Sequence, residues 1–141
     1  MNDSPHPLIR TFAGRRVLLA ERSDHLRGLI SSQINQWRLR TVNTACGLHT
    51  LQHALLASQT RTPFDLLLIN SVLPDLDGLT ITHRLRNARC ASPIIMLGGA
   101  SDDEQAHQSA LDAGAQAYLP RPFGPDELGQ CMYQVLNEIC V

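Results

Sequence analysis

The sequence lacks the features that would mark a membrane, secreted or nucleic-acid-binding protein. Its longest aliphatic runs, LLLI and PIIML, fall far short of the roughly 20 apolar residues that span a bilayer, and the amino terminus has no apolar signal region. Its 12 Lys and Arg against 13 Asp and Glu leave a net charge of −1, which favours neither nucleic acid nor anionic lipid. We therefore expect a cytoplasmic protein with no nucleic-acid partner and no direct membrane contact.

Cysteine is sparse, and its spacing does not suit metal binding. The four cysteines are Cys46, Cys90, Cys131 and Cys140. They form no Cys-x-x-Cys pair, and thiols stay reduced in the cytoplasm. His49 and His53 lie four residues apart on a predicted helix, but no third ligand accompanies them. We expect unpaired thiols, a solvated histidine pair and no metal site.

Short aliphatic runs alternate with amphipathic segments from residue 15 onward. Strands are predicted at 16–20, 39–45, 65–70, 93–98 and 115–120, and helices over 24–37, 47–56, 79–89, 102–113 and 128–139. Five βα units of this size predict one α/β domain with a doubly wound parallel sheet and helices on both faces, because right-handed crossovers leave few other packings. Residues 1–14 contain two prolines and a glycine without periodicity, and they predict a flexible tail or linker remnant before a domain at 15–141.

The residues that follow the predicted strands form the candidate site. In open α/β sheets, ligands bind beyond the carboxyl ends of the strands, so side chains at these positions gather at one edge. The residues expected there are Glu21 and Arg22 after the first strand, Asn70 after the third, Gly98 and Gly99 after the fourth, and Arg121 and Pro122 after the fifth.

Several motifs at these strand ends resemble the receiver domain of two-component response regulators and hybrid histidine kinases. LPDLDG follows the third strand, PIIML opens the fourth, ALDAGAQAYL precedes the fifth and RPF follows it. The resemblance covers about residues 15–139, and the segment FAGRRVLLAERSDHLRGLISSQINQWRLR is most similar to receivers attached to hybrid kinases. It implies a flavodoxin-like receiver fold with five strands in the order 2-1-3-4-5.

The same resemblance implies the residues that a working site would need. A working receiver has an acidic pair after the first strand, an Asp acceptor after the third, a hydroxyl after the fourth and a Lys before a cis proline after the fifth. The carboxylates hold Mg²⁺, the acceptor attacks the phosphoryl group, and the hydroxyl and ammonium groups bind its oxygens. The matching residues here are Glu21, Arg22, Asn70, Gly98 and Arg121. One carboxylate and two guanidinium groups replace three carboxylates and one ammonium, so the formal charge of these positions changes from −2 to +1.

These replacements predict a degenerate phosphoacceptor pocket. The amide of Asn70 cannot form an acyl phosphate, and Arg22 is expected to pair with Glu21 and act as a fixed cation in place of the metal. We therefore expect no catalytic residue, no Mg²⁺ or other cofactor, and no enzyme activity in this domain, although a parent chain can be a histidine kinase. Pro122 is the candidate for the cis bond.

One alternative is a stand-alone atypical response regulator that accepts a phosphoryl group at a displaced acid. The candidates are Asp75, Asp77 and Glu21. Asp75 and Asp77 stand beside a proline and a glycine in LPDLDG, where turn formation is the simpler interpretation.

A second alternative is a regulatory domain that binds a small anion through Arg22 and Arg121, since guanidinium groups suit phosphate oxygens. The simpler interpretation is the Arg22–Glu21 pair with Arg121 solvated. No glycine-rich phosphate cradle follows any predicted strand, which favours that interpretation.

The predicted interaction surface lies around the fifth strand. Tyr118 matches the aromatic position whose ring turns in or out in the receiver family, and without a hydroxyl at residue 98 we expect one orientation to dominate. Tyr118, His107, Phe123 and Gln105 form the candidate face for partners or a homodimer, although a solvated surface fits equally well.

The predicted function is a non-phosphorylatable pseudo-receiver that acts by protein–protein interaction in two-component phosphorelay signalling. We expect it to be part of a hybrid sensor histidine kinase, a parent that can be anchored in the inner membrane. The expected partners are a histidine kinase core, a second receiver or a histidine phosphotransfer domain.

Overall fold

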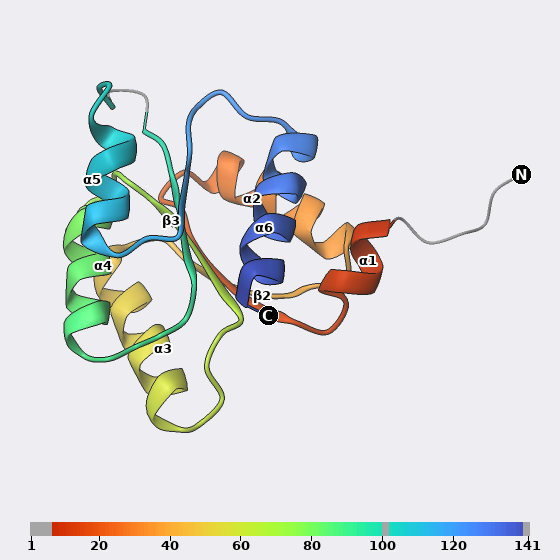
Figure 1. The fold of residues 1–141 in the computed structure, drawn as a ribbon, viewed down its shortest axis with the longest axis horizontal. Helices are drawn as coiled ribbons and strands as arrows, with labels where there is room; N and C mark the ends of the chain where they lie inside the picture. Colours follow the sequence, from red (N-terminus) through yellow and green to blue (C-terminus); the bar gives the residue numbers. More distant parts are fainter. Residues whose placement is uncertain (1–6, 100–101, 140–141) are drawn as a thin grey trace, which may run out of the picture.

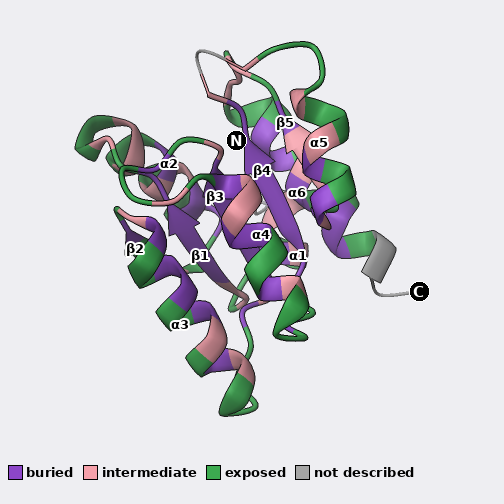
Figure 2. Ribbon diagram, turned by 90° about the vertical axis from the view of Figure 1, so that its left-hand side faces the viewer, coloured by how far each residue is buried: buried purple, intermediate pink, exposed green. Residues whose placement is uncertain are grey.

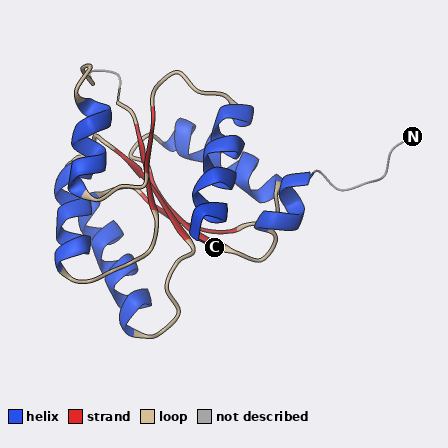
Figure 3. Cartoon of the chain, in the orientation of Figure 1, coloured by secondary structure: helices blue, strands red, loops and turns tan. Residues whose placement is uncertain are grey.

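The computed structural model describes residues 7–99 and 102–139 and has the predicted α/β architecture (Figures 1 and 3). The strands are β1 (Arg16–Ala20), β2 (Arg40–Thr44), β3 (Leu66–Asn70), β4 (Ile94–Leu97) and β5 (Ala117–Leu119). They form one parallel sheet in the order β2-β1-β3-β4-β5, which confirms the predicted flavodoxin-like order. Strands that follow one another in the chain are joined through helices, the kind of connection that parallel pairing requires.

Helices cover both faces of the sheet. They are α1 (Pro7–Phe12), α2 (Asp24–Gln36), α3 (Gly47–Gln59), α4 (Gly78–Asn87), α5 (Ala106–Ala113) and α6 (Pro125–Ile139). Figure 1 shows α3, α4 and α5 on one side and α2, α6 and α1 on the other. No helix within the described ranges has the length and apolar content that a membrane crossing demands.

The central strands are buried on both faces, as Figure 2 shows for β1, β3 and β4. Successive side chains of a strand point to opposite faces, so β3 contributes to two separate core clusters. Leu66 and Leu68 pack in the first core cluster, beneath α2 and α6. Leu67 and Ile69 pack in the second core cluster, beneath α3, α4 and α5. This double burial explains why LLLI is an unbroken apolar run.

The predicted tail over residues 1–14 is wrong from residue 7 onward, and residues 1–6 lie outside the described part. Pro7–Phe12 form helix α1, and the side chain of Phe12 is fully buried. Its ring lies edge-on to Trp37 with a centroid distance of 5.6 Å. The apolar contact with the core outweighs the turn-forming composition of the segment, which had suggested a tail.

Helix α1 approaches α6 closely at a glycine. A Cβ atom at Gly129 would lie 2.7 Å from Leu8 Cδ1 and 3.0 Å from the ring of Trp37. A larger residue at this position would push α1 away from the domain. Helix α1 is therefore a packed part of the domain on the α2–α6 side.

A single arginine ties together the edge of the sheet opposite the candidate site. Arg86 Nη1 donates to the carbonyl oxygens of Cys90 (2.7 Å) and Ser92 (2.9 Å), and Nε donates to Gly114 O (3.0 Å). Nη2 donates to Gln116 Oε1 at 3.0 Å. Burial lowers the pKa of this guanidinium group. These bonds join the end of α4 to the starts of β4 and β5.

Candidate functional site

The carboxyl ends of the strands bring the predicted site residues to one edge of the sheet, at the top of Figure 1. Glu21 directly follows β1, Asn70 ends β3, and Gly98 directly follows β4. Arg121 lies two residues after β5. The parallel order of β1, β3, β4 and β5 therefore places four of the five predicted positions around one point.

Glu21 is the buried carboxylate at the centre of this edge, with a side chain that is only 1% exposed. Its Oε2 accepts hydrogen bonds from Asn70 Nδ2 and, at 3.3 Å, from Arg121 Nη2. Its Oε1 accepts from the backbone N–H of Ser23 at 3.1 Å, and its carbonyl oxygen accepts from Arg27 Nη1 at 2.7 Å. Both carboxylate oxygens are thus satisfied by protein donors, as a buried charge requires.

Asn70 uses both ends of its amide. Nδ2 donates to Glu21, and Oδ1 accepts from the backbone N–H of Val72 at 2.9 Å. An aspartate at this position would place a second negative charge against Glu21, whereas the amide supplies the donor that Glu21 needs. The amide at the acceptor position is therefore an integral part of the hydrogen-bonded site.

The expected pair between Arg22 and Glu21 is wrong. Arg22 is exposed and forms no ion pair with any other residue in 7–99 or 102–139. The partner of Glu21 is Arg121, whose side chain is 29% exposed. Successive side chains at a strand end point in opposite directions, so Glu21 turns toward β3 and β5 while Arg22 turns to solvent.

Gly98 makes room for a tyrosine. A Cβ atom at Gly98 would lie 2.7 Å from Tyr118 Oη and 3.2 Å from Pro120 Cα. The position at which the receiver resemblance implies a hydroxyl side chain is therefore filled by the Tyr118 hydroxyl, which turns into the site.

Asp102 is a site residue that the sequence pattern did not reveal. Its carboxylate accepts from Tyr118 Oη at 2.6 Å, from the Gly99 N–H at 2.8 Å and from Ser71 Oγ at 3.1 Å. A helix was predicted from residue 102, but α5 begins at Ala106 and leaves Asp102 in the preceding loop. An acidic residue just after a Gly-Gly strand end was the available signal.

The candidate interaction face is divided between the two sides of the sheet. His107 and Tyr118 lie together, with ring centroids 5.6 Å apart and planes 24° from parallel. Tyr118 packs against the second core cluster and Phe123 against the first, so Phe123 is not part of the same face. Gln105 is exposed at the start of α5. Burial, followed by the hydrogen bond to Asp102, raises the pKa of Tyr118.

The Arg121–Pro122 peptide bond, expected to be cis, is cis in the structure. Pro122 is exposed, while Arg121 before it reaches back to Glu21.

Asp75 and Asp77 are both engaged at helix amino termini. Asp75 Oδ1 accepts from Gly47 N at 2.6 Å and Oδ2 from Leu48 N at 2.9 Å, and these bonds lower the pKa of Asp75. Asp77 is the N-cap of α4 and accepts from Thr80 N at 2.7 Å. Asp77 acts within its own turn as expected, whereas Asp75 binds the distant helix α3 as well as its own loop.

The donor set at the strand ends does not match that of a receiver magnesium site. Mg²⁺ requires octahedral oxygen ligands with carboxylates among them. Glu21 is the one carboxylate at the centre of the edge, both of its oxygens are hydrogen-bonded, and Arg121 lies 3.3 Å away. Across the described residues, no group of three or more His, Cys, Asp or Glu side chains is arranged to hold a metal.

Neither the histidine pair nor the described thiols take part in the hydrogen bonds around Glu21 and Asp102, although Cys46 follows β2 at the same edge of the sheet. His49 and His53 are both exposed on α3. Cys46, Cys90 and Cys131 are free thiols, and burial raises the pKa of Cys131. Cys140 lies outside the described residues.

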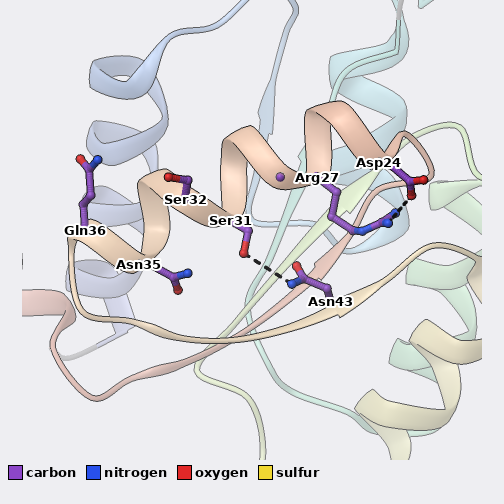
Figure 4. Close-up of a pocket in the computed structure, with 8 residues that line it drawn as sticks. Asp24, Arg27, Ser31, Ser32, Asn35, Gln36 and Asn43 are labelled. Carbon is purple, nitrogen blue, oxygen red and sulfur yellow. Dashed lines mark hydrogen bonds and ion pairs between the residues drawn. The ribbon is translucent and has the colours of Figure 1, made fainter.

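A polar groove along α2 and the neighbouring strand β2 lies beside the site (Figure 4). It is lined by Asp24, Arg27, Gly28, Ser31, Ser32, Asn35, Gln36 and Asn43. Arg27 pairs with Asp24 and also donates to the carbonyl of Glu21, so it links the groove to the end of β1. Asn43 Nδ2 donates to Ser31 Oγ at 3.4 Å. Asn35 and Gln36 bond to residues outside the groove, Thr41 and Gln33.

Comparison with known proteins decides the family. Residues 17–133 match the model of the response regulator receiver domain. The chain belongs to this receiver family. It is 37% identical over 112 residues to the KDP operon transcriptional regulatory protein KdpE of Escherichia coli, covering 79% of this chain and 47% of that protein. It is 36% identical over 113 residues to the transcriptional activator protein PfeR of Pseudomonas aeruginosa, covering 80% of this chain and 35% of that protein. The receiver therefore spans about a third to a half of these relatives.

Solved structures agree with this assignment. The receiver domain of sensor histidine kinase PA1611 from Pseudomonas aeruginosa, which holds a magnesium ion in its active-site cleft, has a TM-score of 0.75 and 26% identity, covering 89% of this chain and 99% of that one. The receiver domain of the Francisella response regulator 1452 has a TM-score of 0.76 at 24% identity, with the same coverage. Receivers are signalling modules of two-component systems that interact with histidine kinases and phosphotransfer proteins.

Proposed function

We propose that this receiver does not accept a phosphoryl group and acts as a protein–protein interaction module in a phosphorelay. The observation that carries the proposal is the amide of Asn70, which stands at the acceptor position and donates to the buried Glu21. An amide oxygen has no full charge with which to attack phosphorus, and the Asn70 oxygen already accepts from Val72 N.

Loss of Mg²⁺ binding is the second part of the proposal. Phosphoryl transfer needs a cation that neutralises the charge on the transferring group. In this receiver a fixed guanidinium, Arg121, pairs with Glu21, the one acidic side chain that is buried among the residues whose burial the structure describes. A divalent ion at Glu21 would meet this positive charge and too few oxygen ligands.

The proposed partners are a histidine kinase core, a second receiver or a histidine phosphotransfer domain. We propose that the receiver is part of a hybrid sensor histidine kinase that is anchored in the inner membrane. The receiver itself would then lie in the cytoplasm, have no catalytic activity and bind no nucleic acid. The similarity to the receiver of sensor histidine kinase PA1611 supports this context. Interfaces between domains of one chain are often small and polar, so we expect weak binding when the receiver is separated from its kinase. A homodimer is a further candidate assembly.

The contacts favour neither alternative function, phosphorylation at a displaced acid or binding of a small anion. A displaced acceptor at Asp75 or Asp77 would have to give up its bonds to a helix amino terminus. An anion site would need two available arginines, but Arg121 is paired with Glu21, which leaves Arg22 exposed without a described partner.

The test is incubation with acetyl phosphate or beryllofluoride and Mg²⁺, followed by intact mass and amide chemical shifts. A receiver with an Asp acceptor, treated in parallel, shows that the reagents work. We expect no covalent adduct and no shift changes at Glu21 or Asn70. A stoichiometric adduct would refute the proposal, and Asp75→Asn and Asp77→Asn variants would then locate it.

The coding sequence around this chain tests the context. A histidine kinase core in the same reading frame supports the hybrid-kinase assignment, whereas a DNA-binding domain there would contradict it.

A further inference from the structure

We propose that Asp102 is a built-in anion that holds Tyr118 turned into the site, so that the surface formed by α5 and β5 keeps one form without any phosphoryl group. The inference rests on the proposed function and deepens it, because it names the residue that sets the interaction surface in a receiver without a phosphorylation switch.

The Asp102 carboxylate gathers donors from three strand ends. Tyr118 Oη donates from β5 at 2.6 Å, Gly99 N from the end of β4 at 2.8 Å, and Ser71 Oγ from the end of β3 at 3.1 and 3.2 Å. Hydrogen bonds to a charged acceptor are short and about twice as strong as neutral ones. One side chain thus joins three neighbouring strands at the site edge.

The two glycines after β4 provide the space that this arrangement needs. A Cβ at Gly98 would lie 2.7 Å from Tyr118 Oη, so a hydroxyl residue there would displace the tyrosine. A Cβ at Gly99 would lie 2.9 Å from Ser71 Oγ and 3.3 Å from Asp102 Oδ1, so it would crowd the carboxylate and its donor. The Gly-Gly sequence therefore suits an inward tyrosine bound to a carboxylate.

Tyr118 is also held from its outer side. The His107 ring stacks against it at 5.6 Å, which couples the tyrosine to the first turn of α5. Within the described residues, no buried side-chain nitrogen or oxygen lacks a hydrogen-bond partner. An anion arriving at this edge would have to compete with Asp102 for Ser71 and Gly99 and with Glu21 for Arg121.

Tyrosine NMR on the whole chain tests whether Asp102 holds Tyr118 in the site. The spectra are simple, because the sequence contains only two tyrosines, Tyr118 and Tyr133. With ¹³C-labelled tyrosine rings and assignment by Tyr118→Phe, the wild type should show one sharp set of Tyr118 signals and a slowly exchanging hydroxyl proton. Asp102→Ala should move or broaden the Tyr118 signals and speed hydroxyl exchange about tenfold or more, as expected for loss of a hydrogen bond to a charged group. Asp102→Asn, which keeps an acceptor oxygen without the charge, should fall between the two.

Asp103→Ala is the matched control, since Asp103 is exposed and, among the described residues, its carboxylate hydrogen-bonds to Gln105 N at 3.0 Å and not to Tyr118. It removes a nearby charge that contributes least to the raised pKa of Tyr118, so it should leave the Tyr118 hydroxyl in slow exchange. The signals of Tyr133 and Trp37 report whether each variant is folded. Gly98→Thr is the independent variant and should displace Tyr118 with Asp102 still present.

Unchanged Tyr118 signals in folded Asp102→Ala would overturn the proposal that Asp102 holds Tyr118 in the site. A rapidly exchanging Tyr118 hydroxyl in the wild type would also overturn it, whether or not Asp102→Ala folds. All of these spectra are recorded without a phosphodonor, so the result is separate from the adduct test. An adduct together with a released tyrosine in Asp102→Ala would refute only the proposed loss of phosphorylation.

Discussion

Glu21 and Asp102 lie at the same edge of the sheet, but they are balanced in different ways. Glu21 is almost completely buried and is paired with a cation, Arg121, and an amide, Asn70. Asp102 is partly buried and is held by a tyrosine hydroxyl, a serine hydroxyl and a backbone N–H. One carboxylate is balanced by opposite charge, and the other by dipoles close to solvent.

The difference shows how a receiver with an amide at the end of β3 keeps both carboxylates at this edge hydrogen-bonded. A buried charge is costly when a partner is removed, whereas a charge near solvent can be rehydrated. Changes around Glu21 should therefore affect stability most, and changes around Asp102 should mainly affect the orientation of Tyr118.

The largest effect is expected for Asn70→Asp, which puts a second carboxylate against Glu21. The free energy of unfolding should fall by about 3 kcal/mol, because a donor is lost and like charges are buried together. Denaturant titration at neutral pH measures the loss. Asn43→Asp, at an exposed position of β2, is the control and should change stability little.

The same Asn70→Asp variant should not become phosphorylated by acetyl phosphate. Arg121 still occupies the position beside Glu21, and residue 22 still lacks a carboxylate. Phosphorylation restored by this single change would contradict the proposal that Arg121 prevents Mg²⁺ binding at Glu21.

Next in size is Arg121→Gln, which removes the cation paired with Glu21. We expect a loss of about 2 kcal/mol, less than for a fully buried pair because Arg121 is 29% exposed. Arg22→Gln is the matched control and should cost less than about 0.5 kcal/mol as an exposed substitution. Equal losses of unfolding free energy in the two variants would indicate that Arg22 pairs with Glu21 as strongly as Arg121 does, contrary to the structure.

A smaller loss of stability, about 1–2 kcal/mol, is expected for Asp102→Ala, because its donors can turn to water. The loss of unfolding free energy in Asp103→Ala should be close to zero. If Asp102→Ala cost more than Arg121→Gln, the proposed ranking of buried and solvent-near carboxylates would be reversed.

The smallest effect at neutral pH concerns the ionisation of Tyr118. Because its pKa is raised in the folded protein, the associated stability is fully present below the ordinary tyrosine value of about 10 and is lost as the pH rises beyond it. Ultraviolet difference absorbance of the wild type against Tyr118→Phe should show Tyr118 protonated where an ordinary tyrosine ionises. Asp102→Ala should titrate at lower pH, and titration near the ordinary value in the wild type would contradict the bond to Asp102.

Particular residues show how far sequence reasoning reached. The strand ends at Glu21, Asn70 and Gly98 could be predicted because buried strands are continuous apolar runs and parallel strands present their carboxyl ends at one edge. Helix α1 was missed because the two prolines and the glycine of residues 1–14 suggested a tail, while the burial of Phe12 against Trp37 depends on residues distant in the sequence.

The sequence by itself determined the receiver fold, the loss of the acceptor carboxylate and the loss of the hydroxyl at Gly98, since these follow from local patterns and residue identity. Only the tertiary structure decided that Arg121, not Arg22, balances Glu21, and that Asp102 binds Tyr118. The physical reason is that side-chain partners depend on direction and on distances of a few ångströms between separate strands, and neither quantity is encoded in the order of residues along one strand.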